Sequence, residues 1–506
     1  MKSRSIGHST TTAVFVILAT WALLCIVGYG AAAQTLERVS IAFNGTQADS
    51  VSYLPSVSAD GCLVAFSSDA ANLVEGDTNR YRDIFVHDRD TGWTERVSIA
   101  SDGTEAIHKS YEPSISADGS VVAFRSEANN LVGGDTNLAR DIFVYGRYTG
   151  QTQRVSIASD GTQANGNSYK PCVSGDGRFV AFESLATNLV PSDTNVRRDI
   201  FVHDTQTGQT QRVSIASDGT QADDSSYRQS ISADGNLVAF MSYATNLVAG
   251  DTNAASDVFV HDRQTGQTER VSVGSLGAQT NARSDSPSIS GNGQVVAFYS
   301  AATNLVAADT NGQLDVFIRD RQAAQTKRVS VASDGAQANG PSDSPSLSDT
   351  GRLVAFRSGA TNLSGVDTNG VVDIFLHDRQ TWQTECVSRG PEGAESNMPS
   401  SSPSISGNGR YTTFSSAASN LVQENEDTNG LQDIFAHDKG EPPSLPGDVN
   451  GDCVVNILDM IGIRNHLNQD PTSPPENLPY DVNGDGSINI LDMIYVRNRL
   501  NTQCEE

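Results

Sequence analysis

The chain has 506 residues, with 34 basic and 60 acidic side chains and a formal net charge of −26. This length predicts two to four domains. The excess of acid repels nucleic acid and anionic lipid, which argues against binding to DNA, RNA or a membrane surface and favours cations as partners.

The N-terminal segment has the layout of a secretory signal peptide. Lys2 and Arg4 precede an apolar run over residues 13–27, and three alanines follow at 31–33. We expect cleavage after Ala33, which removes two basic residues and no acidic one and so lowers the charge from −26 to −28. An uncleaved membrane anchor is the alternative. No later segment approaches the roughly 20 apolar residues of a spanning helix, so we expect no membrane span once the signal (1–33) is removed.

Residues 34–438 contain seven copies of one unit. The Phe of "AFS" and its variants recurs every 58 residues, and the Asp of "DIF" or "DVF" recurs with it. The phenylalanines are Phe66, Phe124, Phe182, Phe240, Phe298, Phe356 and Phe414, and the aspartates are Asp83, Asp141, Asp199, Asp257, Asp315, Asp373 and Asp433. "RVS" occurs once before the first unit and once at the end of each unit up to the sixth. In this last copy Cys386 replaces the Arg.

Each unit is predicted to form four short strands. In the second unit these are residues 112–116, 121–126, 141–147 and 152–158, which are rich in Val, Ile and Phe and bounded by Gly, Asp and Asn. "VVAF" is apolar at consecutive positions, as is typical of a strand covered on both faces. The repeats show no helical period. Seven such units predict an all-β seven-bladed β-propeller, and a parallel β-helix is the alternative, although its repeats are shorter.

The order of the copies predicts how the ring closes. "ERVSIA" stands alone at 37–42, and the last "DIFAHD", at 433–438, has no "RVS" after it. We therefore expect the N-terminal strand to complete blade seven and leave no open sheet edge. The pattern "PSISADGxxVAFxS" with "DIFVHD" and "RVS" resembles TolB-type (WD40-like) propeller repeats. That resemblance implies a fold and not a function, because such propellers serve as binders, scaffolds and enzymes.

Loop length predicts which face of the ring binds a ligand. The turns between strands one and two and between strands three and four are short, whereas the other connections are long, so binding is expected on the loop face. Two positions there differ between the blades. Two residues before the strand-one proline (Gln229 in blade four) stand Tyr53, Tyr111, Tyr169, Tyr227, Asp285, Asp343 and Ser401, and just before "DIF" stand Arg82, Arg140, Arg198, Ser256, Leu314, Val372 and Gln432. The Tyr- and Arg-bearing sector suits a ligand with hydroxyls or a carboxylate, and drift among duplicated blades is the alternative.

The "DTN…D" element, for example Asp77, Asn79 and Asp83, recurs in all seven blades. It is either a calcium site or an Asx-type turn, and we favour the turn because three side-chain oxygens fall short of the 6–8 ligands of calcium. No nucleophile elbow, zinc spacing or phosphate loop occurs, so no catalytic residue is assigned. Five histidines share one strand position and are expected to be packing or surface residues, namely His87, His203, His261, His377 and His437.

After a proline-rich linker (439–446) come two related twelve-residue calcium loops, which start at Asp448 and Asp481 and each run into an amphipathic helix. The predicted calcium ligands are Asp448, Asn450, Asp452, Val454, Asn456 and Asp459 in the first loop and Asp481, Asn483, Asp485, Ser487, Asn489 and Asp492 in the second. Val454 and Ser487 contribute backbone carbonyls. Cys453 stands where the sharp turn usually has Gly, so weaker binding is expected in the first loop.

Two such units resemble a type I dockerin over residues 447–506. The resemblance implies two calcium ions, calcium-dependent folding, and docking onto a cohesin module of a scaffold or cell-surface protein. The contact positions of such modules map onto Ile457, Leu458, Arg464, Ile490, Leu491 and Arg497. The aliphatic pairs suit a hydrophobic docking patch, and closure of the module's own core is the alternative. Cys453 and Cys504 flank the module and are candidates for a disulfide, whereas Cys62, Cys172 and Cys386 are expected to be buried thiols.

These features together predict a secreted, non-catalytic propeller that binds or scaffolds and that a dockerin attaches to a cohesin-bearing extracellular assembly. The alternative is a carbohydrate-active enzyme, a polysaccharide lyase or glycosidase of a cellulosome-like complex, because dockerins often carry such cargo. A unique carboxylate pair in the mouth of the propeller would favour the enzyme.

Overall fold

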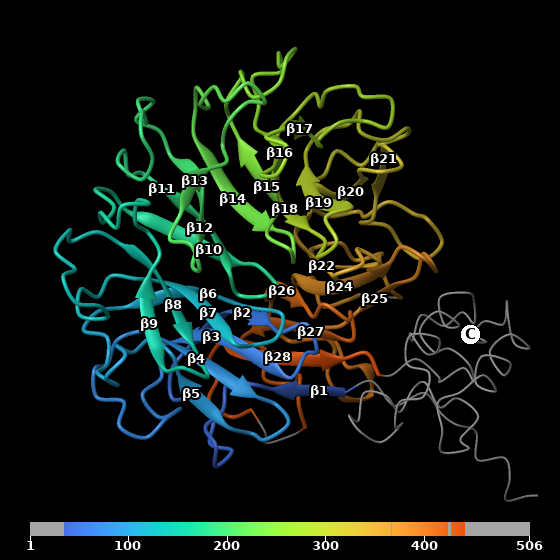
Figure 1. Ribbon diagram of the computed structural model, residues 1–506. Coiled ribbons are helices and arrows are strands. Elements are labelled where there is room, and N and C mark those ends of the chain that lie inside the picture. Colours follow the sequence, from blue (N-terminus) through green and yellow to red (C-terminus); the bar gives the residue numbers. More distant parts are fainter. Residues whose placement is uncertain (1–34, 366, 424–426, 441–506) are drawn as a thin grey trace, which may run out of the picture. The chain divides into compact units, whose positions relative to one another are not determined.

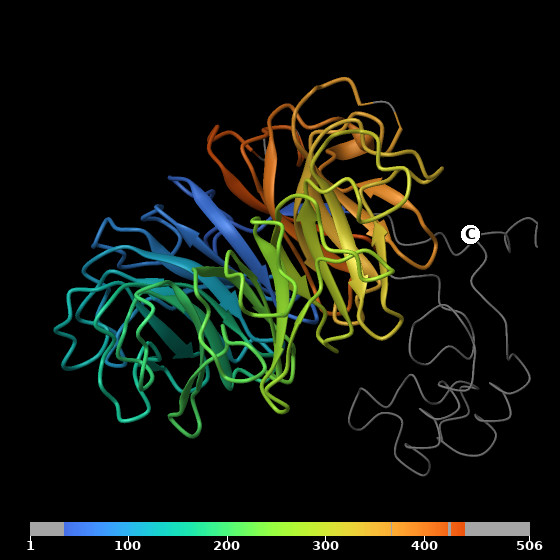
Figure 2. The same cartoon turned by 90° about the horizontal axis from the view of Figure 1, so that it is seen from above.

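The computed structural model describes residues 35–440, except 366 and 424–426. The expected signal peptide, the calcium loops, the docking residues and the Cys453–Cys504 pair lie outside these residues. Thr35–Asp438 forms one compact unit. Its strands make seven antiparallel four-stranded sheets, and the blades follow one another around the ring from blue through green to orange in Figure 1. Figure 2, turned by 90°, shows loops projecting beyond the strand ends. Within the described range no helix has the length and apolar character needed to cross a membrane.

The strands of blades one to three repeat the same order from the innermost to the outermost. Blade one is β2 (Ser52–Val57), β3 (Leu63–Ser68), β4 (Asp83–Asp88) and β5 (Thr94–Arg96). Blade two is β6 (Ser110–Ile115), β7 (Val121–Ser126), β8 (Asp141–Gly146) and β9 (Gln151–Arg154). Blade three is β10 (Ser168–Val173), β11 (Phe179–Ser184), β12 (Asp199–Asp204) and β13 (Thr210–Arg212).

The remaining blades follow the same plan, except that blade six is followed by a short 3-10 turn, η1 (Pro391–Gly393). Blade four is β14 (Ser226–Ile231), β15 (Leu237–Ser242), β16 (Asp257–Asp262) and β17 (Thr268–Arg270). Blade five is β18 (Ser284–Ile289), β19 (Val295–Ser300), β20 (Asp315–Asp320) and β21 (Gln325–Arg328). Blade six is β22 (Ser342–Leu347), β23 (Leu353–Ser358), β24 (Asp373–Asp378) and β25 (Thr384–Cys386).

Blade seven contains strands from both ends of the propeller, as predicted. It combines β26 (Ser400–Ile405), β27 (Tyr411–Ser416) and β28 (Asp433–Asp438) with the N-terminal β1 (Thr35–Arg38). β1 pairs antiparallel with β28, with Thr35 opposite Asp438 and Arg38 opposite Phe435. The seven-bladed ring and its closure by the first strand are therefore confirmed, and the outer edge of blade seven is covered.

The hydrophobic core lies within and between the blades. The Phe of "AFS" stacks on the Phe of "DIF" in every blade, with ring centroids 5.9 Å apart for Phe66 and Phe85. Both rings are fully buried. The buried clusters also cross from blade to blade, as where Ile142 of blade two packs with Val180 and Phe182 of blade three. Each blade thus buries its apolar face against the next one, which explains why the central strands are apolar on both faces.

The fourth strand is shorter than predicted. In blade two β9 ends at Arg154, whereas 152–158 was the expected range. The cause is Ser156, whose Oγ accepts the N–H of Ile142 at 3.0 Å and donates to Asp141 Oδ1 at 2.5 Å. The side chain of Ser156 thus accepts the backbone N–H of Ile142, which would otherwise bond to the backbone of the fourth strand. A single β-bridge between Ile157 and Gln163 follows.

Candidate functional site

The "DTN" and "RVS" motifs form one polar network on each blade. In blade one Arg96 Nη1 lies 3.1 Å from Asp77 Oδ1, and Ser98 Oγ donates to Asp83 Oδ1 at 2.6 Å. Asn79 Oδ1 accepts the N–H of Tyr81 at 2.7 Å, which is the expected Asx turn, and its Nδ2 donates to Asp83 Oδ2 at 2.8 Å. Burial raises the pKa of Asp77, and Arg96 opposes this shift.

The same network recurs around the ring. The corresponding arginine–aspartate pairs are Arg154–Asp135 at 2.9 Å, Arg212–Asp193 at 3.1 Å, Arg270–Asp251 at 3.3 Å, Arg328–Asp309 at 3.1 Å and Arg38–Asp427 at 3.5 Å. Blade six departs, because Cys386 replaces the arginine and its Sγ lies 3.6 Å from Ser388 Oγ. In residues 35–440, gaps apart, no group of three or more His, Cys, Asp or Glu is arranged to hold a metal ion.

The repeated histidines link neighbouring blades. His87 is buried, and its Nδ1 lies 2.8 Å from Oγ1 of Thr94, which in turn donates to the carbonyl of Ile41 at 2.6 Å. Because the Thr94 hydrogen is used on Ile41, Nδ1 of His87 is the donor. His203, His261 and His377 make the same contact, and burial lowers the pKa of all four to about 4. These side chains are packing residues, as expected.

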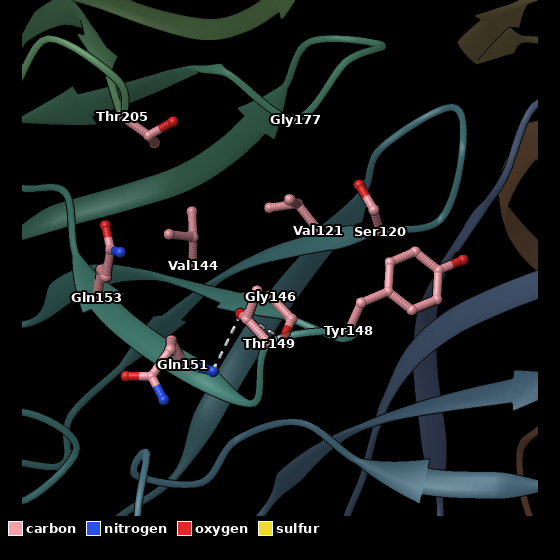
Figure 3. A pocket seen from close by; sticks show the side chains of 10 residues that line it. All are labelled: Ser120, Val121, Val144, Gly146, Tyr148, Thr149, Gln151, Gln153, Gly177 and Thr205. Atoms are coloured by element: carbon pink, nitrogen blue, oxygen red, sulfur yellow. Dashed lines mark hydrogen bonds between the residues drawn. The ribbon is translucent and has the colours of Figure 1, made fainter.

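A shallow pocket of ≈ 260 Å³ lies between blades two and three (Figure 3). Its lining is uncharged and includes Ser120, Tyr148, Thr149 and Gln151. The turn from β8 to β9 contributes Tyr148, which is 79% exposed, so the pocket lies on the short-turn face. Blade two has Gly146 where the other blades have Asp, and a Cβ there would lie 2.5 Å from Thr149 Oγ1.

The innermost strands share a backbone feature for which the sequence carries no signal. The third residue of each has a positive φ of 45–55°, and the pairing with the second strand shifts register beside it. These bulge residues are Leu54, Glu112, Lys170, Arg228, Ser286, Ser344 and Ser402. No Gly, Asn or Asp occurs among them, although these residues usually mark a left-handed conformation. The bulge places five different residue types on an unchanged backbone, with Ser in three of the blades.

The variable Tyr and Arg positions come together at the loop-face end of the innermost strands. Tyrosines and arginines alternate in the order Tyr53, Arg82, Tyr111, Arg125, Tyr169, Arg198 and Tyr227. The distances from guanidinium carbon to ring centroid are 4.1 and 5.3 Å for Arg82, 4.4 and 5.5 Å for Arg125, and 4.4 and 4.9 Å for Arg198. We call these seven residues the Tyr–Arg ladder. Arg125 was not among the predicted site residues, because it belongs to β7 and not to either variable position.

Each predicted arginine of this sector also has an acidic partner. Arg82 lies 2.6 Å from Asp69, Arg140 lies 3.0 Å from Glu127, and Arg198 lies 2.9 Å from Glu183. Arg140 is the most exposed of the three, and its guanidinium carbon lies 5.9 Å from the ring centroid of Tyr169. The ladder is therefore held in place by ion pairs as well as by cation–π contacts.

The opposite sector has smaller or oppositely charged side chains at the same positions. Asp343 pairs with Arg357 at 2.7 Å, and the Oγ atoms of Ser401 and Ser415 lie 3.0 Å apart. Ser256 is buried and donates to the carbonyl of Ser284, whereas Gln432 Nε2 donates to the carbonyl of Ser52. Leu314 and Val372 are half-buried. The mouth of the propeller is therefore asymmetric.

The architecture defines a seven-bladed β-propeller with TolB-like structural neighbours. TolB from Acinetobacter baumannii is 13% identical, with a TM-score of 0.35 over 71% of this chain and 76% of that one. The β-propeller domain of the Trilobed protease from Pyrococcus furiosus is 12% identical, with a TM-score of 0.45 over 76% and 95%. An oligogalacturonate lyase in complex with manganese is 11% identical, with a TM-score of 0.49 over 81% and 95%. At these identities the likeness concerns the fold alone.

The C-terminal segment has a family match of its own. Residues 446–501 match the dockerin type I domain, which confirms the resemblance drawn from the two calcium loops. Dockerin domains are generally calcium-binding, and their presence implies cohesin-mediated assembly. A search of curated protein sequences finds no match to the chain.

Proposed function

We propose that this chain is a secreted, non-catalytic binding or scaffold propeller, attached through its dockerin to a cohesin-bearing extracellular assembly. The dockerin match at 446–501 carries this proposal, because it covers both predicted calcium loops. The domain order is a signal peptide (1–33), the propeller (34–438), a linker (439–446) and the dockerin (447–506). The twelve predicted ligands hold two calcium ions, and the aliphatic pairs with Arg464 and Arg497 contact the cohesin.

The propeller ligand is proposed to bind on the loop face, at the Tyr–Arg ladder. Binding is favoured over catalysis by the state of the acidic residues there. Glu112 lies 3.5 Å from Arg125, Glu183 lies 2.9 Å from Arg198, and Asp285 lies 3.3 Å from Arg228. Each of these three carboxylates is therefore engaged by a guanidinium group. A glycosidase would need a pair of carboxyl groups free to flank the glycosidic bond at this mouth.

Calorimetry with the secreted full-length chain and a panel of type I cohesins tests the attachment. We expect binding in calcium and none in excess chelator, because the carboxylates of each loop repel one another without the cation. Asp481→Ala should weaken binding about tenfold or more, since it removes a first-position ligand. Asp334→Ala, in an exposed propeller turn, is the matched control.

The same preparation tests the absence of catalysis. Neutral and acidic polysaccharides are incubated with the chain in calcium, and new reducing ends and unsaturated products are measured. We expect neither above the level of a buffer blank. Cohesin binding that survives chelation would overturn the proposed attachment, and product formation would establish the enzyme instead.

A further inference from the structure

Lys170 occupies the bulge position of β10, at the mouth of the propeller. The innermost strands contact one another around the ring, so their bulge residues surround the central channel. In blades three and four the bulge residue is the most exposed residue of the strand, while its neighbours are buried or half-buried. Lys170 therefore reaches solvent through the channel on a backbone with φ 45°.

The charges around Lys170 leave one cation without a partner. Glu112 Oε2 accepts the backbone N–H of Lys170 at 2.9 Å, and Glu183 Oε1 accepts that of Arg228 at 2.7 Å. Each of the three nearby carboxylates, Glu112, Glu183 and Asp285, already pairs with an arginine. Across the described part of the chain no carboxylate lies within ion-pair distance of the Lys170 ammonium.

Four cations thus face three carboxylates at this point, in a chain whose net charge is −26. The cations are Arg125, Arg198, Arg228 and Lys170. The surrounding pairs Arg82–Asp69, Arg140–Glu127 and Arg357–Asp343 are balanced within themselves. Partial loss of hydration in the channel lowers the pKa of Lys170 and Arg228 lowers it further, whereas Glu183, Glu112 and Asp285 oppose this shift. A bound anion would supply the missing counter-charge.

The other half of the mouth leaves room for a ligand. Blades five to seven carry Ser286, Ser344 and Ser402 at the bulge position, where blades two to four carry Glu, Lys and Arg. Arg228 Nη1 donates to Ser286 Oγ. The half of the mouth with charged bulge residues therefore meets the half with serines, the serine half, between blades four and five. Hydroxyls of the serines, with those of Tyr169 and Tyr227, can donate and accept hydrogen bonds. A ligand rich in hydroxyl groups with a carboxylate matches this lining.

We propose that the Lys170 ammonium binds the carboxylate of a uronic-acid saccharide at the loop-face mouth of the propeller. This inference rests on the proposed binding function and names its ligand class. The saccharide enters over the serine half, and its carboxylate pairs with Lys170 beside Arg228. A saccharide is favoured over an acidic peptide because the bulge positions of blades five to seven offer the hydroxyls of Ser286, Ser344 and Ser402.

Calorimetry on the full-length chain in calcium tests the inference with a matched pair of sugars. The probes are β-1,4-linked tetraglucuronate and cellotetraose, which differ only in the carboxylate. We expect tetraglucuronate to bind about tenfold or more tightly than cellotetraose, a difference that corresponds to about 1.4 kcal/mol. Raised salt should reduce this preference, since it depends on charge.

Three variants locate the site. Lys170→Gln should abolish the preference for tetraglucuronate, and Lys170→Arg should retain it. Lys327→Gln is the matched control. Lys327 lies on the outer strand of blade five, over the ring of Trp382 in a turn of blade six, and is away from the mouth. Thermal unfolding checks that each variant keeps the fold, and the charge-retaining Lys170→Arg separates a lost contact from a perturbed bulge.

Several outcomes would overturn the inference. Equal binding of the two sugars, or an unchanged preference in Lys170→Gln, would exclude recognition by Lys170. Tetraglutamate bound as tightly as tetraglucuronate would point to an acidic peptide instead. Loss of binding in Tyr148→Ala would move the site to the short-turn pocket. Cohesin binding measured on the same samples shows separately whether the dockerin attachment holds.

Discussion

The outer and inner parts of the blades keep the repeat to different degrees. Outside, the Asp–Arg pair recurs in six of the seven blades, and blade seven completes it with Arg38 from the far end of the propeller. Inside, the bulge residue changes from Leu54 to Lys170 to Ser402 while the backbone keeps its positive φ. The outer network therefore fixes the strands within each blade, and closes the ring at blade seven, while the mouth is free to differ from blade to blade.

Opening the ring is the strongest way to break the outer network. Deleting residues 34–43 removes β1 and buried Val39, and it takes away the Arg38 partner of Asp427 and one of the two partners of Asp433, Ser40. We expect the free energy of unfolding to fall by roughly 5 kcal/mol or more, because a buried carboxylate left unpaired costs about 3–5 kcal/mol and lost burial of Val adds to it. Thermal and urea unfolding measure the change.

The control for the deletion is Thr35→Ala, at the exposed start of the same strand, which should leave the transition unchanged. An unaltered unfolding curve for the deletion would mean that β1 contributes nothing to closure.

Blade six offers a natural test of one arginine, since it has Cys386 in that place. Arg212→Cys makes blade three resemble blade six and leaves Asp193, whose side chain is 2% exposed, without its ion pair. We expect a loss of about 3 kcal/mol. Cys386→Arg should stabilise the ring by about 1 kcal/mol. Urea unfolding midpoints compare the two.

Arg178→Cys is the matched control in blade three, because Arg178 pairs with Asp204 but is 33% exposed. Its effect should stay below about 1 kcal/mol. Equal losses in Arg178→Cys and Arg212→Cys would show that burial of the outer network is not what makes it stabilising.

The buried histidines make the ring sensitive to acid. Burial lowers the pKa of His203 from 6.5 to about 4, so the imidazole of His203 stays neutral in the folded state at pH values where the unfolded chain takes up a proton. The stability that His203 contributes is therefore present above pH 6.5 and is lost as the pH falls toward 4. His203→Tyr, which copies Tyr145 of blade two, should reduce this loss by roughly 1 to 3 kcal/mol.

Unfolding free energies of the wild type and of His203→Tyr are compared between pH 7 and 4. The acidic groups are the same in both proteins, so the difference reports on His203. The reverse change, Tyr145→His, should add acid sensitivity to blade two. Parallel pH profiles for the wild type and both variants would contradict a role for these rings in pH dependence.

The regular part of the fold follows from repetition in the sequence. The seven blades, the Asx turns at Asn79 and its equivalents, and the closing strand were all predictable from spacing, because hydrogen-bonding residues recur every 58 positions. The bulge was not predictable, since residues as different as Leu54 and Arg228 occupy it. Lys170 gains its meaning only from neighbours such as Glu112 and Arg228, each 58 residues away along the chain.

The shared bulge has a consequence for how this molecule can acquire new partners. A non-glycine residue in the left-handed conformation is strained, and the ring accepts that strain in all seven blades. Since the backbone there does not depend on the side chain, one point mutation changes one attachment point and leaves the other six in place. The seven blades thus present a combinatorial set of seven positions, in which recognition can be rewritten stepwise without refolding the scaffold.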